Sequence, residues 1–434
     1  MKKHWITTLA LALSFLVVLS ACTLPALAAE DPSSLSGTLN VALAGDVAPE
    51  AIPAWIKMFK EDYPNVTVNV AVVDGGNVAL TFDPLVAADT MPDVTYVDAS
   101  PYFLTLAERG YFLDISDRKG WDKQYDVIKE TYTTSDGLHF AVADGMCAMV
   151  LYYNEDHFKA AGISEPPTNW DEFVEACETL KAAGFVPYGV AGAGPNNMCH
   201  SLLGFGIAYE IFANGYDPDW SRKAAEGPYD FGTPEWQKVL ERAAYMRDQG
   251  YFQPGYESTD LHGCLRLLAS GEVSMSVHYS MQAGNIFIND DVHLNCTTVP
   301  WNPAGQPQVN IASASQGFAL GRNNSGNLEL AKIFFDYISY DHADVLQNMN
   351  HMIPPFKDKA DMPNAIVDPP IQAFWDKATQ LLTQPGVPEL LMTTMMYDQA
   401  KVFMQEVILG MAEPNMIGEY LNPTQEEYVA SIGR

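Results

Sequence analysis

The sequence predicts an α/β protein in which strands alternate with helices, followed by a helical C-terminal third. Residues 38–43 alternate between apolar and polar side chains, as in a strand with one buried face. A helical repeat follows, with Ile52, Trp55 and Phe59 on one face, and residues 66–73 form a second β-branched run. A strand, a helix and a strand in this order predict a right-handed parallel unit.

The same alternation continues along the chain. Short apolar runs predict further strands at residues 93–97, 138–143, 149–153, 186–190 and 273–278. Apolar stripes at helical spacing predict helices at residues 102–110, 173–180, 328–338 and 389–410. Thr168 and Asn169 precede the second of these helices in a pattern close to a capping box, and Gly184 marks its end. No sequence signal by itself fixes a domain boundary.

The N-terminus carries an export signal. Lys2 and Lys3 precede an apolar run over residues 6–19 that is too short for a helix that stays in a membrane. The run ends in Leu-Ser-Ala followed by Cys22, which resembles a bacterial lipobox, where a lipid such as palmitate is attached and the chain is cut before the cysteine. This interpretation makes residues 1–21 a lipoprotein signal peptide and Cys22 the membrane-anchored first residue.

A second cleavage pattern keeps an alternative open. Residues 26–28, Ala-Leu-Ala, fit ordinary signal-peptide cleavage, which would release the protein from the membrane. Residues 22–36 are rich in Pro, Ser, Ala and acids and have no periodicity, so we expect a flexible tether. Both interpretations place the protein outside the cytoplasm.

The chain is strongly acidic, with 24 Lys and Arg against 54 Asp and Glu and a formal charge of -30. This charge argues against nucleic acid as a partner and against adhesion of the protein surface to anionic lipid. About 410 residues remain after signal cleavage, more than one core usually serves, so two domains are expected.

Motifs for catalysis or for a cofactor are missing. The sequence has no HExxH, GxSxG, Walker or GxGxxG pattern, and the nine histidines are scattered. We therefore expect no cofactor, no metal site and no catalytic residue. Five cysteines follow Cys22 without a CxxC pair; Cys177 fits a buried free thiol, and one disulfide among the others stays open.

A succession of short phrases resembles the family 1 extracellular solute-binding proteins of bacterial ABC importers, the group that contains maltose-binding protein. Each phrase is weak alone, and their order makes the resemblance specific. They lie at residues 92–94 (Pro-Asp-Val), 106–115, 138–143, 151–162, 166–173, 271–275, 316–320, 331–338 and 402–421.

The resemblance implies a two-lobed, type II periplasmic-binding-protein-like fold, with two doubly wound sheets joined by a hinge. Lobe 1 would comprise residues 37–143 and 316–350, and lobe 2 residues 144–315 and 351–434. The hinge would lie near Asp144 and residues 313–316. Solute would be held between the lobes, beyond the carboxyl ends of the strands.

Candidate binding residues come from the same resemblance. Sugars need polar partners for their hydroxyls and flat aromatic faces for their rings. The family often carries a stacking tryptophan where this chain has Tyr279, whereas Trp236 is expected in the core. The candidates are Gly45, Asp46, Asp74, Asp98, Tyr102, Asp144, Tyr279, Trp301, Gln316, Tyr397 and Asp398.

The implied function is a lipid-anchored binding protein of an ABC importer that captures a mono- or oligosaccharide by lobe closure. Its partners would be the solute, the permease subunits and the membrane, and the protein itself would be a monomer without enzymatic activity. Two alternatives stay open: a binder of another polar solute, such as a polyamine or a phosphorylated compound, and an exported glycoside hydrolase.

Overall fold

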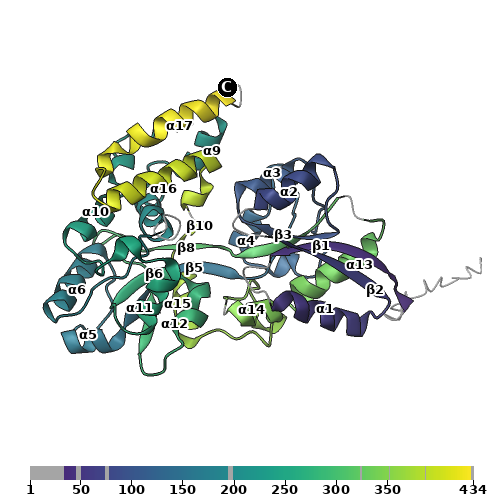
Figure 1. Ribbon diagram of the computed structural model, residues 1–434, viewed down its shortest axis with the longest axis horizontal. Helices are drawn as coiled ribbons and strands as arrows, with labels where there is room; N and C mark the ends of the chain where they lie inside the picture. The colour runs from purple at the N-terminus through teal and green to yellow at the C-terminus, as the bar shows by residue number, and fades with distance from the viewer. Residues whose placement is uncertain are drawn as a thin grey trace, which may run out of the picture.

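The computed structural model describes residues 34–44, 50–73, 78–193, 199–322, 325–350, 352–386 and 388–431. They form two α/β lobes that lie side by side along the long axis of the molecule, with the C-terminal helices stacked on the second lobe (Figure 1). The two-lobed α/β class expected from the sequence is confirmed.

The first sheet has five strands in the order β2-β1-β3-β9-β4. Strand β1 pairs in parallel with both β2 and β3, whereas β9 returns antiparallel between β3 and β4. The predicted unit of two parallel strands and a connecting helix is confirmed, with Ile52, Trp55 and Phe59 buried on one helix face. The strands are β1 (Gly37–Ala44), β2 (Val66–Val73), β3 (Val94–Asp98), β4 (Val142–Ala143) and β9 (Gln316–Leu320).

Helices cover both faces of this sheet. In Figure 1, α2 and α3 lie above it and α1, α13 and α14 lie below it. Trp55 and Phe59 of α1 contact Phe318 of β9 and Phe334 of α13, which closes the lower layer. The helices are α1 (Ala51–Asp62), α2 (Val78–Ala87), α3 (Pro101–Glu108), α4 (Asp126–Thr131), α13 (Leu328–Asp336) and α14 (Asp344–Asn350).

The second sheet has the order β10-β8-β5-β6, and β7 also pairs with β5. All nine residues of β5 are buried. Its alternate side chains enter different apolar clusters, Val150 and Tyr152 on one face and Leu151 and Tyr153 on the other. Because β5 is covered on both faces, apolar side chains predominate along it instead of alternating with polar ones. The strands are β5 (Met146–Asn154), β6 (Met275–Tyr279), β7 (Leu294–Thr297), β8 (Val309–Ala314) and β10 (Leu382–Pro385).

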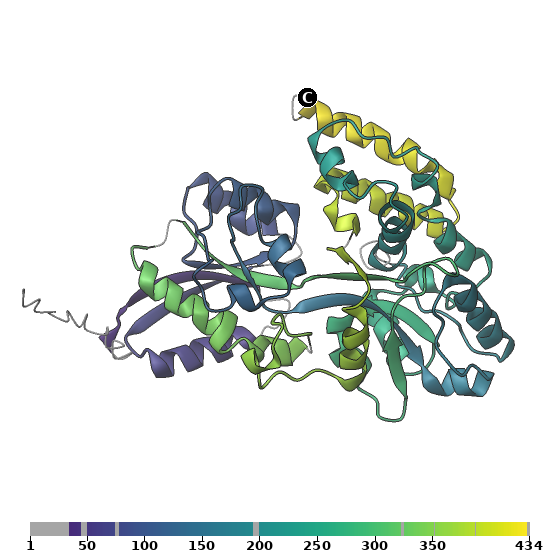
Figure 2. The ribbon, with the colours of Figure 1, turned by 180° about the vertical axis from the view of Figure 1, so that it is seen from behind.

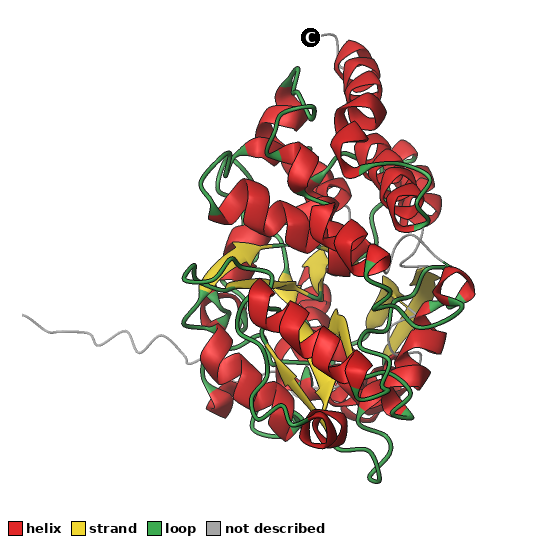
Figure 3. Cartoon of the chain, turned by 90° about the vertical axis from the view of Figure 1, so that its left-hand side faces the viewer, coloured by secondary structure: helices red, strands yellow, loops and turns green. Residues whose placement is uncertain are grey.

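Helices enclose the strands of the second lobe as well (Figure 3). Two π-helical turns, Cys199–Leu203 and Ala208–Ala213, flank α8. Trp236 is fully buried in this lobe, as predicted. The helices are α5 (Glu155–Ala161), α6 (Trp170–Ala182), α8 (Gly204–Ile207), α9 (Trp220–Glu226), α10 (Glu241–Asp248), α11 (Leu261–Ala269), α12 (Ala283–Ile286), α15 (Pro369–Ala378), α16 (Thr394–Ile408) and α17 (Ile417–Ser431).

Local signals explain the start of α6. The side chain of Asn169 accepts a hydrogen bond from the backbone N–H of Glu172 at 3.1 Å, and Glu172 Oε2 accepts from the backbone N–H of Thr168 at 2.8 Å. The reciprocal pair satisfies two helix-end donors, as in a capping box.

Two expected strands differ from the structure. Residues 186–190 form no strand; of them, Tyr188 makes isolated bridges to Phe252 and to Met275, the first residue of β6. Of residues 138–143, only Val142 and Ala143 pair with β9 as a strand.

Three segments of chain cross between the lobes next to one another, two of which are the long strands in the middle of Figure 2. The first passes through Asp144 and Gly145, and the second through Ser315, whose N–H donates to the Gly145 carbonyl at 2.9 Å. The third segment passes the same place before it crosses, at Ile353, whose carbonyl accepts from Met146 N–H at 2.7 Å. Its continuation stays on the first lobe, since Phe356 pairs with Gln124, so the chain leaves lobe 1 later than the expected boundary after residue 350.

Candidate functional site

Three polar residues lie in a row where the first sheet meets the crossings. Asp98 ends β3 and stands opposite Gln316, the first residue of β9. Asp144 follows β4 and lies on the other side of Gln316, joined to it by backbone hydrogen bonding. Since β1, β2 and β3 are parallel, this row is at the edge where their carboxyl ends meet, the usual place for a ligand in an open α/β sheet.

Asp144 is the most enclosed member of the row, with 2% of its surface exposed. Its Oδ1 accepts a hydrogen bond from the backbone N–H of Gln316 at 3.1 Å. Burial raises the pKa of the Asp144 carboxyl to about 7, because loss of water disfavours the ionised form and the backbone donors offset only part of this effect. Near neutral pH this group can therefore give up or take up a proton.

Asp98 is less enclosed. Its Oδ1 accepts from the backbone N–H of Ser100 at 2.9 Å, and the Tyr96 hydroxyl donates to its Oδ2 at 3.4 Å. Burial raises the pKa of the Asp98 carboxyl above its ordinary value, although the hydrogen bonds from Ser100 and Tyr96 act in the opposite direction. Neither acid forms an ion pair with a basic side chain of the described residues.

Tyr132 lies near the two acids and is not among the residues predicted from the sequence. It follows α4, is fully buried, and packs its ring edge-on against Phe140 with the centroids 5.5 Å apart. Its hydroxyl lies in the electrostatic field of Asp144 and Asp98, which together with burial raises the tyrosine pKa. No hydrogen-bond partner for this hydroxyl is found among the described residues.

The second lobe contributes sulfur and hydroxyl groups beside the crossings. Tyr279, half-buried at the end of β6, accepts a hydrogen bond on its carbonyl from the Tyr152 hydroxyl at 3.2 Å. The Ser280 hydroxyl accepts from the backbone N–H of Ala148 at 3.1 Å. Cys147 and Met281 place their sulfur atoms 3.1 Å apart. Burial raises the pKa of the Cys147 thiol to about 12, so it stays protonated.

The other first-lobe candidates are Gly45, Asp46, Asp74 and Tyr102. Gly45, Asp46 and Asp74 lie outside the described residues, next to the ends of β1 and β2. Tyr102 is half-buried on α3 and donates its hydroxyl to Asp83 Oδ1 of α2 at 2.7 Å. That hydrogen bond ties two helices together.

The structure corrects the assignment of Trp301 as a stacking platform. Only 1% of its surface is exposed, and its ring contacts Trp170, Phe173 and Phe205 at centroid distances of 5.1 to 6.3 Å. With both faces covered by protein, this indole belongs to the core of the second lobe and has no face for a solute.

Tyr397 and Asp398 are neighbours on α16 and are engaged by one lysine. Lys401 Nζ lies 4.4 Å from the Tyr397 ring centroid and 2.7 Å from Asp398 Oδ1. Tyr397 is half-buried and Asp398 exposed, so both remain accessible on the helix.

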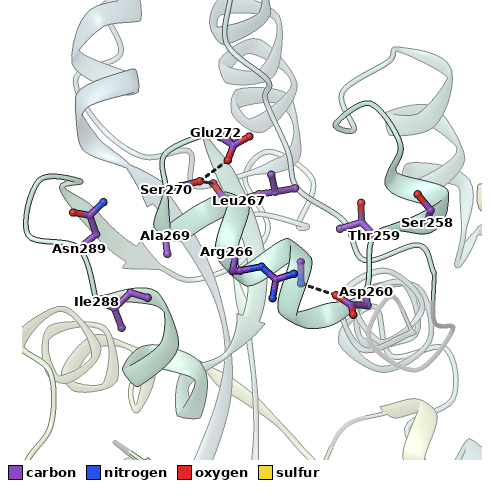
Figure 4. Close-up of a pocket in the computed structure, with 11 residues that line it drawn as sticks. Ser258, Thr259, Asp260, Arg266, Leu267, Ala269, Ser270, Glu272, Ile288 and Asn289 are labelled. Carbon is purple, nitrogen blue, oxygen red and sulfur yellow. Dashed lines mark hydrogen bonds between the residues drawn. The ribbon is translucent and has the colours of Figure 1, made fainter.

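A separate hollow of about 790 Å³ lies on the second lobe (Figure 4). It is lined by α11 and by Ile288 and Asn289, far along the chain from the crossings. Its acidic side chains already have local partners: Asp260 Oδ1 accepts from Gly263 N–H at the start of α11, and Glu272 accepts from the Ser270 hydroxyl at 2.9 Å. These contacts describe helix capping, so we place the candidate site at the crossings instead.

The structure describes the side chains of four cysteines. Cys147, Cys177, Cys264 and Cys296 are buried free thiols, as expected for Cys177. Over the described part of the chain, no three His, Cys, Asp or Glu side chains gather as metal ligands would. None of the helices there combines the length and apolar character that crossing a membrane requires.

Comparison with known proteins gives a family match. A family model described as "Bacterial extracellular solute-binding protein" matches residues 44–339, more than half of the chain. The sn-glycerol-3-phosphate-binding periplasmic protein UgpB of Brucella melitensis is 22% identical over 311 residues, which cover 68% of this chain and 63% of that relative.

Solved structures show the same fold. A chitin oligosaccharide binding protein aligns with a TM-score of 0.77 at 18% identity, covering 91% of this chain and 99% of the other. A sugar transporter from Bacillus licheniformis in complex with stachyose aligns with a TM-score of 0.71 at 16% identity, covering 91% and 100%. At these identities the likeness concerns the fold.

Proposed function

The chain belongs to the bacterial extracellular solute-binding proteins, and from this premise we propose that it captures a saccharide between its lobes and delivers it to the permease of an ABC importer. The observation that carries the proposal is the row of Asp98, Gln316 and Asp144 at the crossings. Solute bound there would touch both lobes, and a permease can recognise the loaded form only if the solute shifts the balance between open and closed lobes.

The chemistry of the row suits hydroxyl groups. Carboxylate oxygens and the amide of Gln316 accept or donate hydrogen bonds, and the half-buried Tyr279 offers an aromatic face. Lobe closure would remove water from this edge, which strengthens each hydrogen bond to the solute. Structural neighbours that bind a chitin oligosaccharide and stachyose support a sugar as the solute.

A phosphorylated solute is the second candidate within the same class. The relative whose name gives sn-glycerol 3-phosphate as its ligand supports it. Asp98 and Asp144 argue against a phosphorylated solute. No basic side chain of the described residues neutralises these acids, so they would repel a phosphate. The exported glycoside hydrolase is the weaker alternative, since the family consists of binding proteins.

We further propose that lipid on Cys22 holds the mature protein to the outer face of the membrane, that residues 22–36 act as the tether, and that the protein works as a monomer. We also propose that lobe 1 comprises residues 37–143 with 316–350, and lobe 2 residues 144–315 with 351–434. The last boundary is then moved beyond Phe356, which pairs with Gln124 of lobe 1.

Melting the purified protein with neutral sugars, polyamines and sugar phosphates tests the function. A true solute raises the melting temperature, and the rise increases with the logarithm of its concentration above the dissociation constant. Mass spectrometry of the recovered sugar then separates the classes: a binding protein returns it unchanged and a hydrolase returns fragments. Stabilisation by no saccharide in a broad panel would overturn the proposal.

A further inference from the structure

The site at the crossings holds two carboxyl groups that no basic side chain of the described residues neutralises. Asp98 and Asp144 stand on either side of Gln316, and both carboxyls are largely withdrawn from water. Their partners are hydrogen-bond donors of the backbone, Ser100 and Tyr96. An ionised carboxylate that leaves water needs a counter-charge or a proton, because hydrogen bonds alone rarely offset the loss of hydration.

The Tyr132 hydroxyl is a second, independent observation. The residue is fully buried, the charges of both acids act on its hydroxyl, and that hydroxyl has no hydrogen-bond partner among the described residues. A buried polar group without a partner is costly, so native proteins keep few of them unless a ligand completes the bonding. A phenol oxygen can accept a hydrogen bond from an ammonium group.

We propose that Asp98, Asp144 and Tyr132 form a subsite for a protonated amine, so that the solute is an amino sugar or a similar hydroxylated amine rather than a neutral or phosphorylated sugar. This inference rests on the proposed capture of a solute between the lobes. The ammonium group would contact Asp98 directly, with the Asp144 charge behind it and the Tyr132 oxygen as a third acceptor.

Around the two acids, the side chains that the structure describes supply no other charge. Tyr96 comes from β3, Tyr132 follows α4, and Cys147 comes from β5; Gln316 of β9 is neutral. The pKa values of Tyr132 and Cys147 lie above their ordinary values, so both groups stay uncharged at neutral pH. Among the described residues there, the group whose charge changes near neutral pH is the Asp144 carboxyl, and the pKa of Asp98 is raised in the same direction.

Matched sugars test the subsite. Glucosamine and glucose 6-phosphate each differ from glucose at one substituent. The β-1,4-linked dimers of glucosamine, glucose and N-acetylglucosamine differ only at C2 of each ring. Binding is measured by calorimetry at pH 6.5, where the amines are protonated. We expect the amine of at least one series to bind at least tenfold more tightly than its neutral counterpart and the phosphate not to bind. A neutral or phosphorylated member that binds as tightly as the amine, or no binding of any amine, overturns the inference.

Proton release gives a second readout. Binding of an ammonium group should ionise Asp144, so titrations in buffers of different ionisation enthalpy should show protons leaving the protein. The variant Asp144→Asn should abolish this release, and glucose should produce none in the wild type. An amine that binds without releasing protons from the wild-type protein would contradict the role of Asp144.

The hydroxyl of Tyr132 is tested by removing it alone. Tyr132→Phe keeps the ring against Phe140, so we expect an unchanged or higher melting temperature without ligand and at least a fivefold loss of amine affinity. Tyr188→Phe, in the core of the second lobe, is the control and should leave affinity unchanged. Binding of neutral sugars without any preference for amines would overturn this inference and leave the saccharide-binding function standing.

Discussion

Asp144 and Gln316 hold each other through two hydrogen bonds that run in opposite directions. The backbone N–H of Asp144 donates to the Gln316 carbonyl at 3.0 Å, and the backbone N–H of Gln316 donates to Asp144 Oδ1 at 3.1 Å. One residue lies on the first crossing and the other on the second, so this pair fixes the spacing of the two crossings. Any rotation of the lobes must therefore turn the segments on either side of the pair.

The first prediction concerns pH and Asp144. The folded-state pKa of about 7 lies above the ordinary value, so between about pH 4 and pH 7 the folded protein binds more protons than the unfolded chain. The contribution of this group to stability is therefore fully present at low pH and declines as pH rises to about 7, by up to about 4 kcal/mol. Asp144→Asn should flatten the fall in melting temperature between pH 5 and pH 8.

The control for this experiment is Asp398→Asn, which changes an exposed acid of α16. It should retain the wild-type slope of melting temperature against pH. A wild-type slope in Asp144→Asn as well would show that the buried carboxyl is not the group that titrates.

The second prediction concerns affinity and Asp98. Asp98→Asn keeps the size of the side chain but removes the charge, and a hydrogen bond to a charged group is worth about 1.5–3 kcal/mol. We expect a tenfold to hundredfold loss of affinity for the solute by calorimetry, with little change in melting temperature without ligand. Asp117→Asn, an exposed acid of the first lobe, is the control. Unchanged affinity in Asp98→Asn would remove this acid from the site.

The third prediction reassigns Trp301 to the core. Trp301→Ala empties a space enclosed by Trp170, Phe173 and Phe205 and should destabilise the protein by about 3–5 kcal/mol. Trp301→Phe should cost less because it leaves part of the ring in place. Affinity measured well below the melting temperature should not change in either variant. Lost affinity with unchanged stability would restore the stacking role.

The fourth prediction concerns the closeness of β4 and β9. A Cβ atom on Gly317 would stand 2.7 Å from the carbonyl oxygen of Val142, which belongs to backbone and cannot move aside. Gly317→Ala should therefore destabilise the protein by about 1–3 kcal/mol in urea unfolding. Gly227→Ala, where a Cβ meets nothing within 4 Å, should be close to neutral. Equal stability of the two variants would contradict the described packing.

The fifth prediction concerns the anchor, which lies outside the described residues. Cys22→Ser should leave either an uncut precursor or a protein that is shed through cleavage at residues 26–28. Growth with a labelled fatty acid measures the outcome, and the label should enter the wild type alone. On our proposal that residues 22–36 act as a tether outside both lobes, the solute affinity of the shed form should equal that of the wild type. Label found in Cys22→Ser would overturn the lipid assignment.

The sequence predicts those parts of the fold that depend on local pattern. The β1-α1-β2 unit follows from the alternation of residues 38–43 and the stripe of Ile52, Trp55 and Phe59. Residues 186–190 show the same kind of apolar run but form no strand. Strand formation requires a partner, and the partner is set by tertiary packing that a short window of sequence does not contain.

Some residues of the candidate site could be predicted from the sequence and others could not. Asp98, Asp144 and Gln316 could be named because each adjoins a strand end or a crossing in the family order. Tyr132 could not, because its distance from the acids depends on how α4 packs across the crossings. Trp301 was assigned wrongly, since an aromatic residue after a strand has the same sequence pattern whether its faces meet solute or other side chains.

Strand β5 has a mechanical consequence. It begins at Met146, beside all three crossings, and runs uninterrupted to Asn154 while pairing with β6, β7 and β8 along the way. Nine residues of strand measure roughly 30 Å, so a turn of about 10° at the inner end would carry the outer end roughly 5 Å. The strand would act as a stiff lever, so a small torsional change at Asp144 would displace the outer end of β5 by several times as much. A partner that binds the outer end of the second lobe could distinguish the two positions.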